Sequence, residues 1–224
     1  LLNKADLADE RQTAKWQQYF EKQGCFVVAL NARNRNSMKA INGVVAEACK
    51  EKIERDRKRG ILNRPVRAMV VGIPNVGKST FINSFAGKAC AKTGNKPGVT
   101  KGKQWIRLSK TLELLDTPGI LWPKFEDQQV GLNLALIGSM NDEILNIEEM
   151  AVSLIQYLKD VYPLLLTKRY DLSDEAEESC KNEQDAYEVL AQIARNRKCV
   201  LKGDEPDIRK AAALLLDDFR SGSI

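Results

Sequence analysis

The first third of the chain alternates between helical spacing and short apolar runs. Apolar residues recur every three or four positions over 9–24 and 37–60, which predicts two helices that each end at a glycine. Continuous apolar runs at 25–30 and 67–72 are typical of strands buried on both faces. The second run leads directly into residues 79–87, a further helical pattern that ends at a glycine.

Two more apolar stretches, 103–109 and 111–116, are predicted to be paired strands. Because strands and helices alternate up to this point, the pattern predicts an α/β fold with a mostly parallel sheet and helices on its faces. We place this domain at residues 1–122.

The pattern changes after residue 122. Long strands are absent, and helical spacing recurs in four segments, 128–138, 146–163, 183–198 and 206–222. We therefore expect residues 123–224 to form a small all-helical domain, joined to the first near WPKFED (122–127).

Composition limits the class of protein. No apolar run approaches the roughly 18 residues that a membrane span needs, so we expect no membrane partner. The five cysteines are scattered without a CxxC pair, which favours reduced thiols in a cytoplasm. The sequence has no histidine, so any catalysis must rely on other groups. Since the chain opens on Leu1 within an apolar run, we expect it to be a fragment that lacks an upstream part.

Charge is unevenly distributed. Residues 1–122 contain 23 Lys/Arg and 10 Asp/Glu, whereas residues 123–224 contain 12 and 20. A basic block at 50–67 fits either a solvated helix surface or a nucleic-acid partner, because neutralisation of phosphates drives such binding.

GIPNVGKST (72–80) matches the phosphate-binding loop, with an apolar strand before it and a helix after it. Gly72 and Gly77 let the backbone curl so that its N–H groups point at phosphate oxygens. We expect Lys78 to reach the β- and γ-phosphates and the hydroxyl of Ser79 to ligate Mg²⁺. The remaining residues expected at the phosphates are Asn75, Val76 and Thr80.

LELLDTPG (112–119) ends a predicted strand in Asp116. Its carboxylate is expected near the Mg²⁺ ion, and the amide of Gly119 is expected at the γ-phosphate. DxxG alone also occurs in ordinary turns, but here it follows Lys78 by 38 residues at the end of a strand.

KPGVTKG (96–102) lies between these motifs, and Thr100 is its only threonine. We interpret it as the switch threonine that binds Mg²⁺ when the γ-phosphate is present; a passive connector is the alternative. Lys78, Thr100 and Gly119 then form the predicted catalytic set.

Asn3-Lys4-Ala5-Asp6 is an NKxD tetrapeptide, the sequence with which small GTP-binding proteins recognise guanine. The carboxylate of Asp6 can accept hydrogen bonds from the N1–H and exocyclic amine of guanine, which adenine cannot offer in that geometry. Asn3 and Lys4 are expected to brace the base, and the loop at Asn31-Ala32 to touch its O6 atom.

These motifs run along the chain in an unusual order, because the guanine motif precedes the phosphate loop. Ligand binding depends on where loops lie at the carboxyl edge of a sheet, and their order along the chain is immaterial to it. We therefore predict a circularly permuted P-loop GTPase domain, a rearrangement that closely spaced termini tolerate.

With these motifs the chain resembles the circularly permuted GTPases, and within them the bacterial ribosome biogenesis GTPase A (YlqF) family. The resemblance rests on NKAD, GIPNVGKST, KTGNKPGVTKGKQW (92–105) and LELLDTPGILWPKFEDQ (112–128), and covers residues 1–160 more firmly than the tail. It implies GTP hydrolysis coupled to late assembly of the large (50S) ribosomal subunit, contact with its precursor and its rRNA, and a helical C-terminal RNA-binding domain. DNA is not an expected partner.

Two residues modify the expected mechanism. Ile120 stands where small GTPases carry a glutamine that orients the attacking water, and the family is thought to use an N-terminal histidine that this chain lacks. We therefore expect GTP binding with slow hydrolysis. Asn75 resembles the asparagine of potassium-activated GTPases, so K⁺ is expected beside the phosphates; an asparagine that only braces the loop is the alternative.

Basic pairs and clusters in the second half could contact RNA or simply be solvated: Lys168-Arg169, Arg195 to Lys198, and Arg209-Lys210. Two other functions stay open at this point. The chain could be a scaffold that binds GTP structurally without turnover, or an ATPase, although Asp6 argues against the latter.

Overall fold

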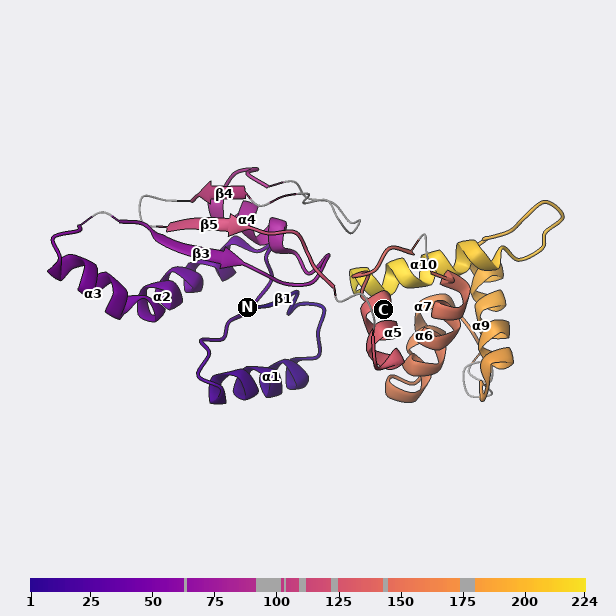
Figure 1. The fold of residues 1–224 in the computed structure, drawn as a ribbon. Coiled ribbons are helices and arrows are strands. Elements are labelled where there is room, and N and C mark those ends of the chain that lie inside the picture. The colour runs from indigo at the N-terminus through magenta and orange to yellow at the C-terminus, as the bar shows by residue number, and fades with distance from the viewer. Residues whose placement is uncertain are drawn as a thin grey trace. The chain divides into compact units, whose positions relative to one another are not determined.

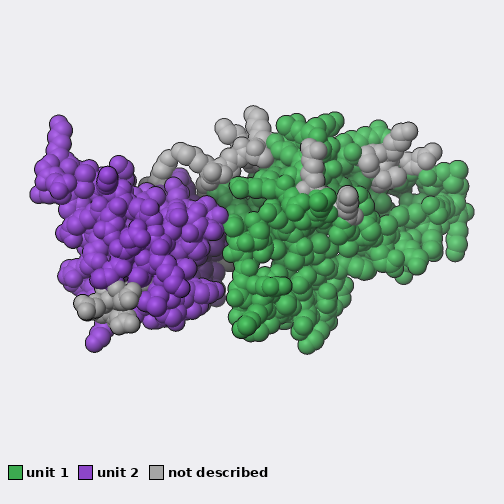
Figure 2. Space-filling view, turned by 180° about the vertical axis from the view of Figure 1, so that it is seen from behind, with its two compact units in different colours: residues 1–123 green, residues 124–224 purple. Residues whose placement is uncertain are grey.

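A computed structural model describes residues 1–62, 64–91, 102, 104–108, 112–121, 125–142, 145–173 and 180–224. The chain divides into two compact units, residues 1–123 and 124–224 (Figure 2). The division lies one residue from the boundary that the sequence predicts. No helix in the described segments is long and apolar enough to cross a membrane.

The sheet of unit 1 that leads into the phosphate loop has three strands, β3 (Val66–Val70), β4 (Gln104–Arg107) and β5 (Leu112–Asp116). Strand β5 lies in the middle, parallel to β3 and antiparallel to β4 (Figure 1). The predicted pairing of the last two strands is thus confirmed. Because β3 pairs in register with β5, Val70 stands beside Asp116, and the loops after both strands start at the same edge.

A second, separate pair consists of β1 (Leu2–Asn3) and β2 (Ala29–Leu30), which are parallel. Two expectations are wrong here. Among the described residues the strands form two sheets where one was predicted, and only Ala29–Leu30 of the run 25–30 is a strand. The physical reason is local: β2 has a two-residue partner, and Phe26 stays 57% exposed.

The helices of unit 1 largely follow the predicted segments. They are α1 (Glu10–Lys22), α2 (Lys39–Ala48), α3 (Lys50–Lys58) and α4 (Lys78–Ala86). The single helix predicted over 37–60 is wrong, because a 3₁₀ turn occupies 35–38 and the chain leaves helical geometry at Cys49. Spacing alone misses this break, since both halves have helical periodicity.

The core of unit 1 lies between the sheet and α4. Phe81 and Ile82 of α4 pack with Ile106, Leu112 and Leu114 from the strands. Strand β3 is partly buried on one side and exposed on the other, since Met69 and, just beyond the strand, Val71 are more than half exposed. The expectation that the run 67–72 is buried on both faces is therefore wrong.

The described elements of unit 2 are helical apart from one isolated bridge, Val200 to Pro206. Its helices are α5 (Gln128–Leu136), α6 (Ile147–Val161), α7 (Leu165–Tyr170), α9 (Glu183–Asn196) and α10 (Ile208–Ser221). Four lie in the predicted segments. The six-residue α7 was missed, because it is too short to show a periodicity.

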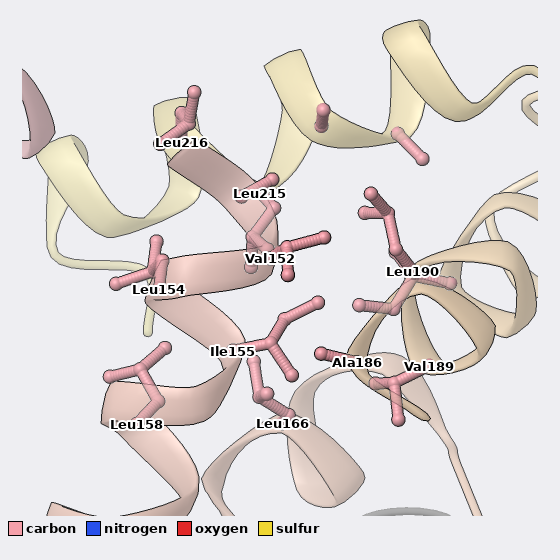
Figure 3. Packing of buried hydrophobic residues seen from close by; sticks show 14 of the residues in the cluster. Val152, Leu154, Ile155, Leu158, Leu166, Ala186, Val189, Leu190, Leu215 and Leu216 are labelled. Atoms are coloured by element: carbon pink, nitrogen blue, oxygen red, sulfur yellow. The ribbon is translucent and has the colours of Figure 1, made fainter. Parts of the chain in front are cut away.

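Helix α6 is the centre of unit 2, and α9 and α10 pack against it. Leu154 and Ile155 of α6 are fully buried, as are Leu190 of α9 and Leu215 of α10 (Figure 3). Side-chain oxygens close the helix starts, for example at Asn146 before α6 and at Asn182, which forms a capping box with Asp185.

Candidate functional site

The phosphate loop connects β3 to α4 through three residues with positive φ. Gly72 has φ 155°, Asn75 58° and Gly77 90°. Asparagine tolerates the left-handed region better than most residues, which suits position 75. The chain therefore curls between strand and helix, and the N-terminal end of α4 begins directly at Lys78.

The ammonium group of Lys78 lies inside this curl. Its Nζ donates hydrogen bonds to the carbonyl oxygens of Gly72 at 2.9 Å and Ile73 at 2.7 Å. Burial lowers the pKa of Lys78, while the nearby carboxylate of Asp116 acts in the opposite direction. The side chain is thus held at the loop that would cradle phosphates.

Asn3 joins three loops that are far apart in the sequence. Its Nδ2 donates to the carbonyl oxygen of Val76 at 2.8 Å, and its Oδ1 accepts from the backbone N–H of Ala32 at 3.0 Å. A Cβ added at Gly77 would stand only 2.4 Å from Asn3 Nδ2. The start of the NKxD motif, the loop after β2 and the phosphate loop are therefore fastened by one amide.

The other predicted guanine-binding residues lie close in sequence to Asn3 or to Ala32, its hydrogen-bond donor. Lys4 has φ 57°, and Asp6 follows in an exposed turn. Ala32 is buried, whereas the Oδ1 of Asn31 accepts from the N–H of Arg33 at 2.8 Å and so shapes its own loop. The structure gathers Asn3 and Ala32 next to the phosphate loop, and Asp6 lies three residues from Asn3.

Asp116 ends β5 as a buried carboxylate, 2% exposed. Within the part of the chain that the structure describes, its Oδ1 has no hydrogen-bond partner. Burial raises the pKa of Asp116, which the positive charge of Lys78 and a backbone hydrogen bond at Thr117 partly offset. A buried acceptor without a partner is costly in a folded protein, so this atom calls for a ligand.

Gly119 lies against the phosphate loop. A Cβ at this position would be 2.6 Å from the Cα of Pro74 and 2.9 Å from Lys78 Nζ. Only glycine permits this approach, which brings the DxxG segment to the same place as Lys78. Ile120, the next residue, is 74% exposed.

Thr117 was not singled out in the sequence. Its hydroxyl donates to the carbonyl oxygen of Val70 at 2.7 Å, and the residue is 8% exposed. This bond ties the loop after β5 to the end of β3. The sequence did offer a hint of this role, because Thr117 lies within the DxxG motif, where a hydroxyl can donate a hydrogen bond to the end of a neighbouring strand.

The residues present fit a Mg²⁺ ion with few protein ligands. Ser79, the second residue of α4, offers a hydroxyl, and Asp116 offers the buried oxygen that lacks a partner among the described residues. Mg²⁺ usually keeps several waters and binds through one or two protein oxygens together with substrate phosphates. Thr100, the third predicted ligand, lies outside the described residues.

The structure ties two of the basic clusters of unit 2 into its fold. Arg169 pairs with Asp218 at 3.0 Å, and the guanidinium of Arg197 lies 5.2 Å from the centre of the Tyr170 ring. Arg197 and Asn196 also donate to carbonyl oxygens at the end of α7. These two arginines therefore have structural contacts, whereas Lys168, Arg195 and Lys198, which neighbour them in the sequence, are exposed.

Comparison with known proteins extends these observations. The model of a family described as 50S ribosome-binding GTPase matches residues 67–200. Ribosome biogenesis GTPase A of Bacillus cereus is 45% identical over 224 residues, covering all of this chain and 73% of that protein. The protein of the same name from Thermotoga maritima is 32% identical over 222 residues, covering 99% and 71%.

Two solved structures of T. maritima YlqF are also similar. The GDP-bound structure has a TM-score of 0.62 and 27% identity, covering 99% of this chain and 78% of that one. The GNP-bound structure has a TM-score of 0.60 and 26% identity, covering 98% and 75%. The converging loops at Asn3, Lys78 and Gly119 thus lie in a P-loop GTPase fold, and the chain belongs to the ribosome biogenesis GTPase A family.

Proposed function

We propose that the chain binds GTP at this site, hydrolyses it, and acts in the cytoplasm in late assembly of the large ribosomal subunit. The observation that carries the proposal is the pair of hydrogen bonds of Asn3, which fastens the guanine motif to the phosphate loop. A nucleotide held at one end by Asp6 and at the other by Lys78 suits that arrangement. The names of the relatives supply the ribosomal context.

In this proposal the G domain is circularly permuted and comprises residues 1–122. The backbone N–H groups of residues 75–80 and the ammonium of Lys78 hold the phosphates. The hydroxyl of Ser79 and the carboxylate of Asp116 would hold Mg²⁺, which offsets phosphate charge when bound. Asn75, in its left-handed conformation, would hold K⁺.

GTP is proposed to favour one conformation of the loops around Thr100 and Gly119, and that conformation is proposed to bind the ribosomal precursor with a different affinity. Such a shift requires that GTP binds one conformation more tightly than the other. The chain alone should turn over slowly. Ile120 is exposed and apolar, and the sequence contains no histidine that could orient water. These two features also favour the second candidate, a scaffold that holds GTP without meaningful turnover.

One experiment separates the two. GTP turnover is measured with and without large-subunit precursor particles, in K⁺ and in Na⁺ buffer. We expect the particles to stimulate multiple turnover, and K⁺ to raise it further. If turnover stays at the level of the blank in all four conditions, only the scaffold function remains. If the rates in K⁺ and Na⁺ are equal, the K⁺ site is removed from the proposal.

Guanine specificity has its own test. Asp6→Ala should weaken GTP binding by about 100-fold or more, because a site built to pair with polar groups discriminates strongly when one partner is removed. ATP competition should be negligible for the unchanged protein. If ATP displaces GTP at equal concentration, the site does not select guanine and the proposal fails in favour of the ATPase alternative.

The rRNA-facing surface is proposed to include the basic residues at and after the end of α3. Lys58 and Arg59 are exposed, and Arg64 follows them. Replacing all three by Glu should weaken binding to precursor particles and reduce its dependence on salt, because fewer phosphate counterions are released. Replacing Lys168, Arg195 and Lys198 by Glu tests the helical unit in the same assay. If a triple variant binds precursor particles as tightly as the unchanged protein does, the three residues that it replaces are not part of the rRNA-facing surface.

A further inference from the structure

Thr117 connects the ends of two strands through its side chain. The parallel ladder between β3 and β5 ends at the pair Val70 and Asp116. One residue further along, the hydroxyl of Thr117 donates to the carbonyl oxygen of Val70 at 2.7 Å, and the residue is buried there. The connection between the two strands therefore continues past the ladder by one side-chain hydrogen bond.

The same residue also acts on the carboxylate of Asp116. The backbone N–H of Thr117 contributes a hydrogen bond to this carboxylate. Asp116 Oδ1, by contrast, has no partner among the residues that the structure describes, so it stays available to a ligand. Because the backbone of Thr117 holds the carboxylate and its hydroxyl holds β3, this residue sets where the carboxylate stands relative to that strand.

The end of β3 is also the start of the phosphate loop. Gly72 follows Val70 by two residues, and its carbonyl oxygen accepts a hydrogen bond from Lys78 Nζ at 2.9 Å. Ser79 is the next residue of α4. The hydrogen bond to Val70 therefore ties the Asp116 carboxylate to the segment that carries the predicted hydroxyl ligand of Mg²⁺.

Two further features restrict the conformation of Thr117. Pro118 follows it, and the residue before a proline is disfavoured in the helical region. Threonine is also branched at Cβ, which makes rotation about χ1 stiff. Valine would keep both restraints and nearly the same volume, and would remove only the hydroxyl. Thr117→Val is therefore a clean probe of the hydrogen bond to Val70.

We propose that Thr117 is a positioning residue for Mg²⁺: its hydroxyl keeps the Asp116 carboxylate where it can hold the ion together with Ser79. This inference rests on the proposed function, in which these two side chains hold Mg²⁺ beside the bound nucleotide. Thr117 acts on the ion only through Asp116. Groups that orient metal-binding side chains raise metal affinity, because a ligand that is already held in place loses less freedom when the ion binds.

The test measures the GDP affinity of Thr117→Val and of the unchanged chain, each with Mg²⁺ and with the chelator EDTA. GDP is the probe because it lacks the γ-phosphate, so the contact expected at Gly119 does not enter. The factor by which Mg²⁺ tightens GDP binding should fall by about three- to tenfold, the size of one lost hydrogen bond. Affinity in EDTA should stay within about twofold. If the factor is unchanged, even with weaker binding overall, Thr117 serves only the fold and the proposal is overturned.

Two other variants serve as rescue and control. Thr117→Ser keeps the hydroxyl and should recover most of the Mg²⁺ factor; a loss as large as that of Thr117→Val would mean that the hydroxyl does not position the carboxylate. Thr13→Val is the matched control, because the hydroxyl of Thr13 also donates to a backbone carbonyl, that of Asp9 at 2.9 Å. It should leave the factor unchanged, and the same loss there would remove the assignment to Thr117.

The remaining outcomes are also decisive. Should Thr117→Val fail to fold, Thr117→Ala, which lacks the hydroxyl as well, decides by the same factor. If neither variant folds, the hydroxyl is needed for the fold itself and the proposal falls.

Failure of the proposed function looks different. If the unchanged chain does not bind GDP, the nucleotide site is wrong, and if it binds GDP equally with and without Mg²⁺, the Mg²⁺ site is wrong. The role of Thr117 falls with either result. A failure confined to the Thr117 variants leaves the proposed function standing.

Discussion

The contacts within unit 1 differ in kind from the contacts within unit 2. Of the largest fully buried side chains among the described residues, all but Ile82 lie in unit 2, mainly on α6, α9 and α10. Unit 1 leaves Met69, Val71 and Phe26 more than half exposed. In addition to its smaller apolar core, unit 1 has hydrogen bonds that join its loops, such as those of Asn3 and Thr117.

The difference shows that packing for stability and loops for ligand binding make different demands on a sequence. Apolar burial is non-directional and proportional to area, so helices with complementary faces can form a dense core without any special loop. Loops that must admit a charged ligand cannot be packed in that way. They keep polar atoms in reach of the ligand, including a buried carboxylate oxygen, Asp116 Oδ1, that has no hydrogen-bond partner among the described residues.

The largest effect should come from the core of unit 2. Leu154 is fully buried on α6. Leu154→Ala should lower the free energy of unfolding of unit 2 by about 2 to 5 kcal/mol, because it removes buried methylenes and leaves a cavity. All three tryptophans lie at or before position 122, so their fluorescence follows unit 1, while far-UV circular dichroism also follows the helices of unit 2.

We expect the dichroism transition of Leu154→Ala to move to lower denaturant and GDP affinity to stay constant. Leu201→Ala is the control, since Leu201 is 54% exposed and should change stability little. If Leu154→Ala also loses GDP affinity, nucleotide binding by unit 1 depends on the stability of unit 2, and the contrast between the units fails.

A smaller effect of opposite sign is expected at Asp116. Burial raises the pKa of Asp116 in the folded state above its value in the unfolded chain. The folded state therefore binds this proton more tightly, and the carboxyl group favours folding at acid pH but increasingly opposes it as pH rises above the unfolded-state pKa.

Asp116→Asn should accordingly stabilise nucleotide-free unit 1 near neutral pH, by about 1 kcal/mol, because it removes a buried charge that Lys78 and the backbone at Thr117 offset only in part. It should also abolish the effect of Mg²⁺ on GTP binding. Denaturation followed by tryptophan fluorescence, and titration with GTP at varied Mg²⁺, measure the two effects. A destabilised variant would mean that the carboxylate has a stabilising partner in solution.

The smallest effect concerns a polar contact within unit 2. Tyr170 is fully buried, and its hydroxyl donates to Asp218 Oδ2 at 2.9 Å. Although burial alone would raise the pKa of Asp218, hydrogen bonds from Arg169 and Tyr170 lower it overall. A lowered folded-state pKa contributes stability that is present above the unfolded-state value near 3.8 and is lost as pH falls.

Tyr170→Phe should cost about 1 kcal/mol at neutral pH, the usual net value of one hydrogen bond, and less at pH 3. Dichroism-monitored denaturation at the two pH values tests this. An equal loss at both would mean that the effect comes from removal of the hydroxyl itself and does not depend on the charge of Asp218.

The sequence predicted the elements best where a pattern has many repeats. Helices α6, α9 and α10 lie within their predicted segments, because long amphipathic helices show their period over several turns. It failed where the outcome depends on a neighbour. The run 25–30 has strand composition, yet only Ala29–Leu30 is paired, since strand formation needs a partner.

The candidate site shows the same limit. Glycines and lysine at fixed spacing predicted the phosphate loop at 72–80, since that spacing itself creates the curl. The hydrogen bonds of the Asn83 side chain to the backbone of Cys90 and Ala91 gave no such signal. An asparagine in a helix is unremarkable until the chain beyond the helix returns to it.

The sequence by itself determined the local features of this protein: its helical segments, its phosphate loop and the motifs that mark the GTPase family. These depend on residues close together along the chain, whose geometry short-range sterics and hydrogen bonding set. Tertiary structure decided what joins them: that Asn3 fastens onto Val76, that Gly119 meets Pro74, and that the Oδ1 of Asp116 is left without a partner. Such contacts bridge tens of residues, and their existence depends on how strands and helices pack, which no local pattern encodes.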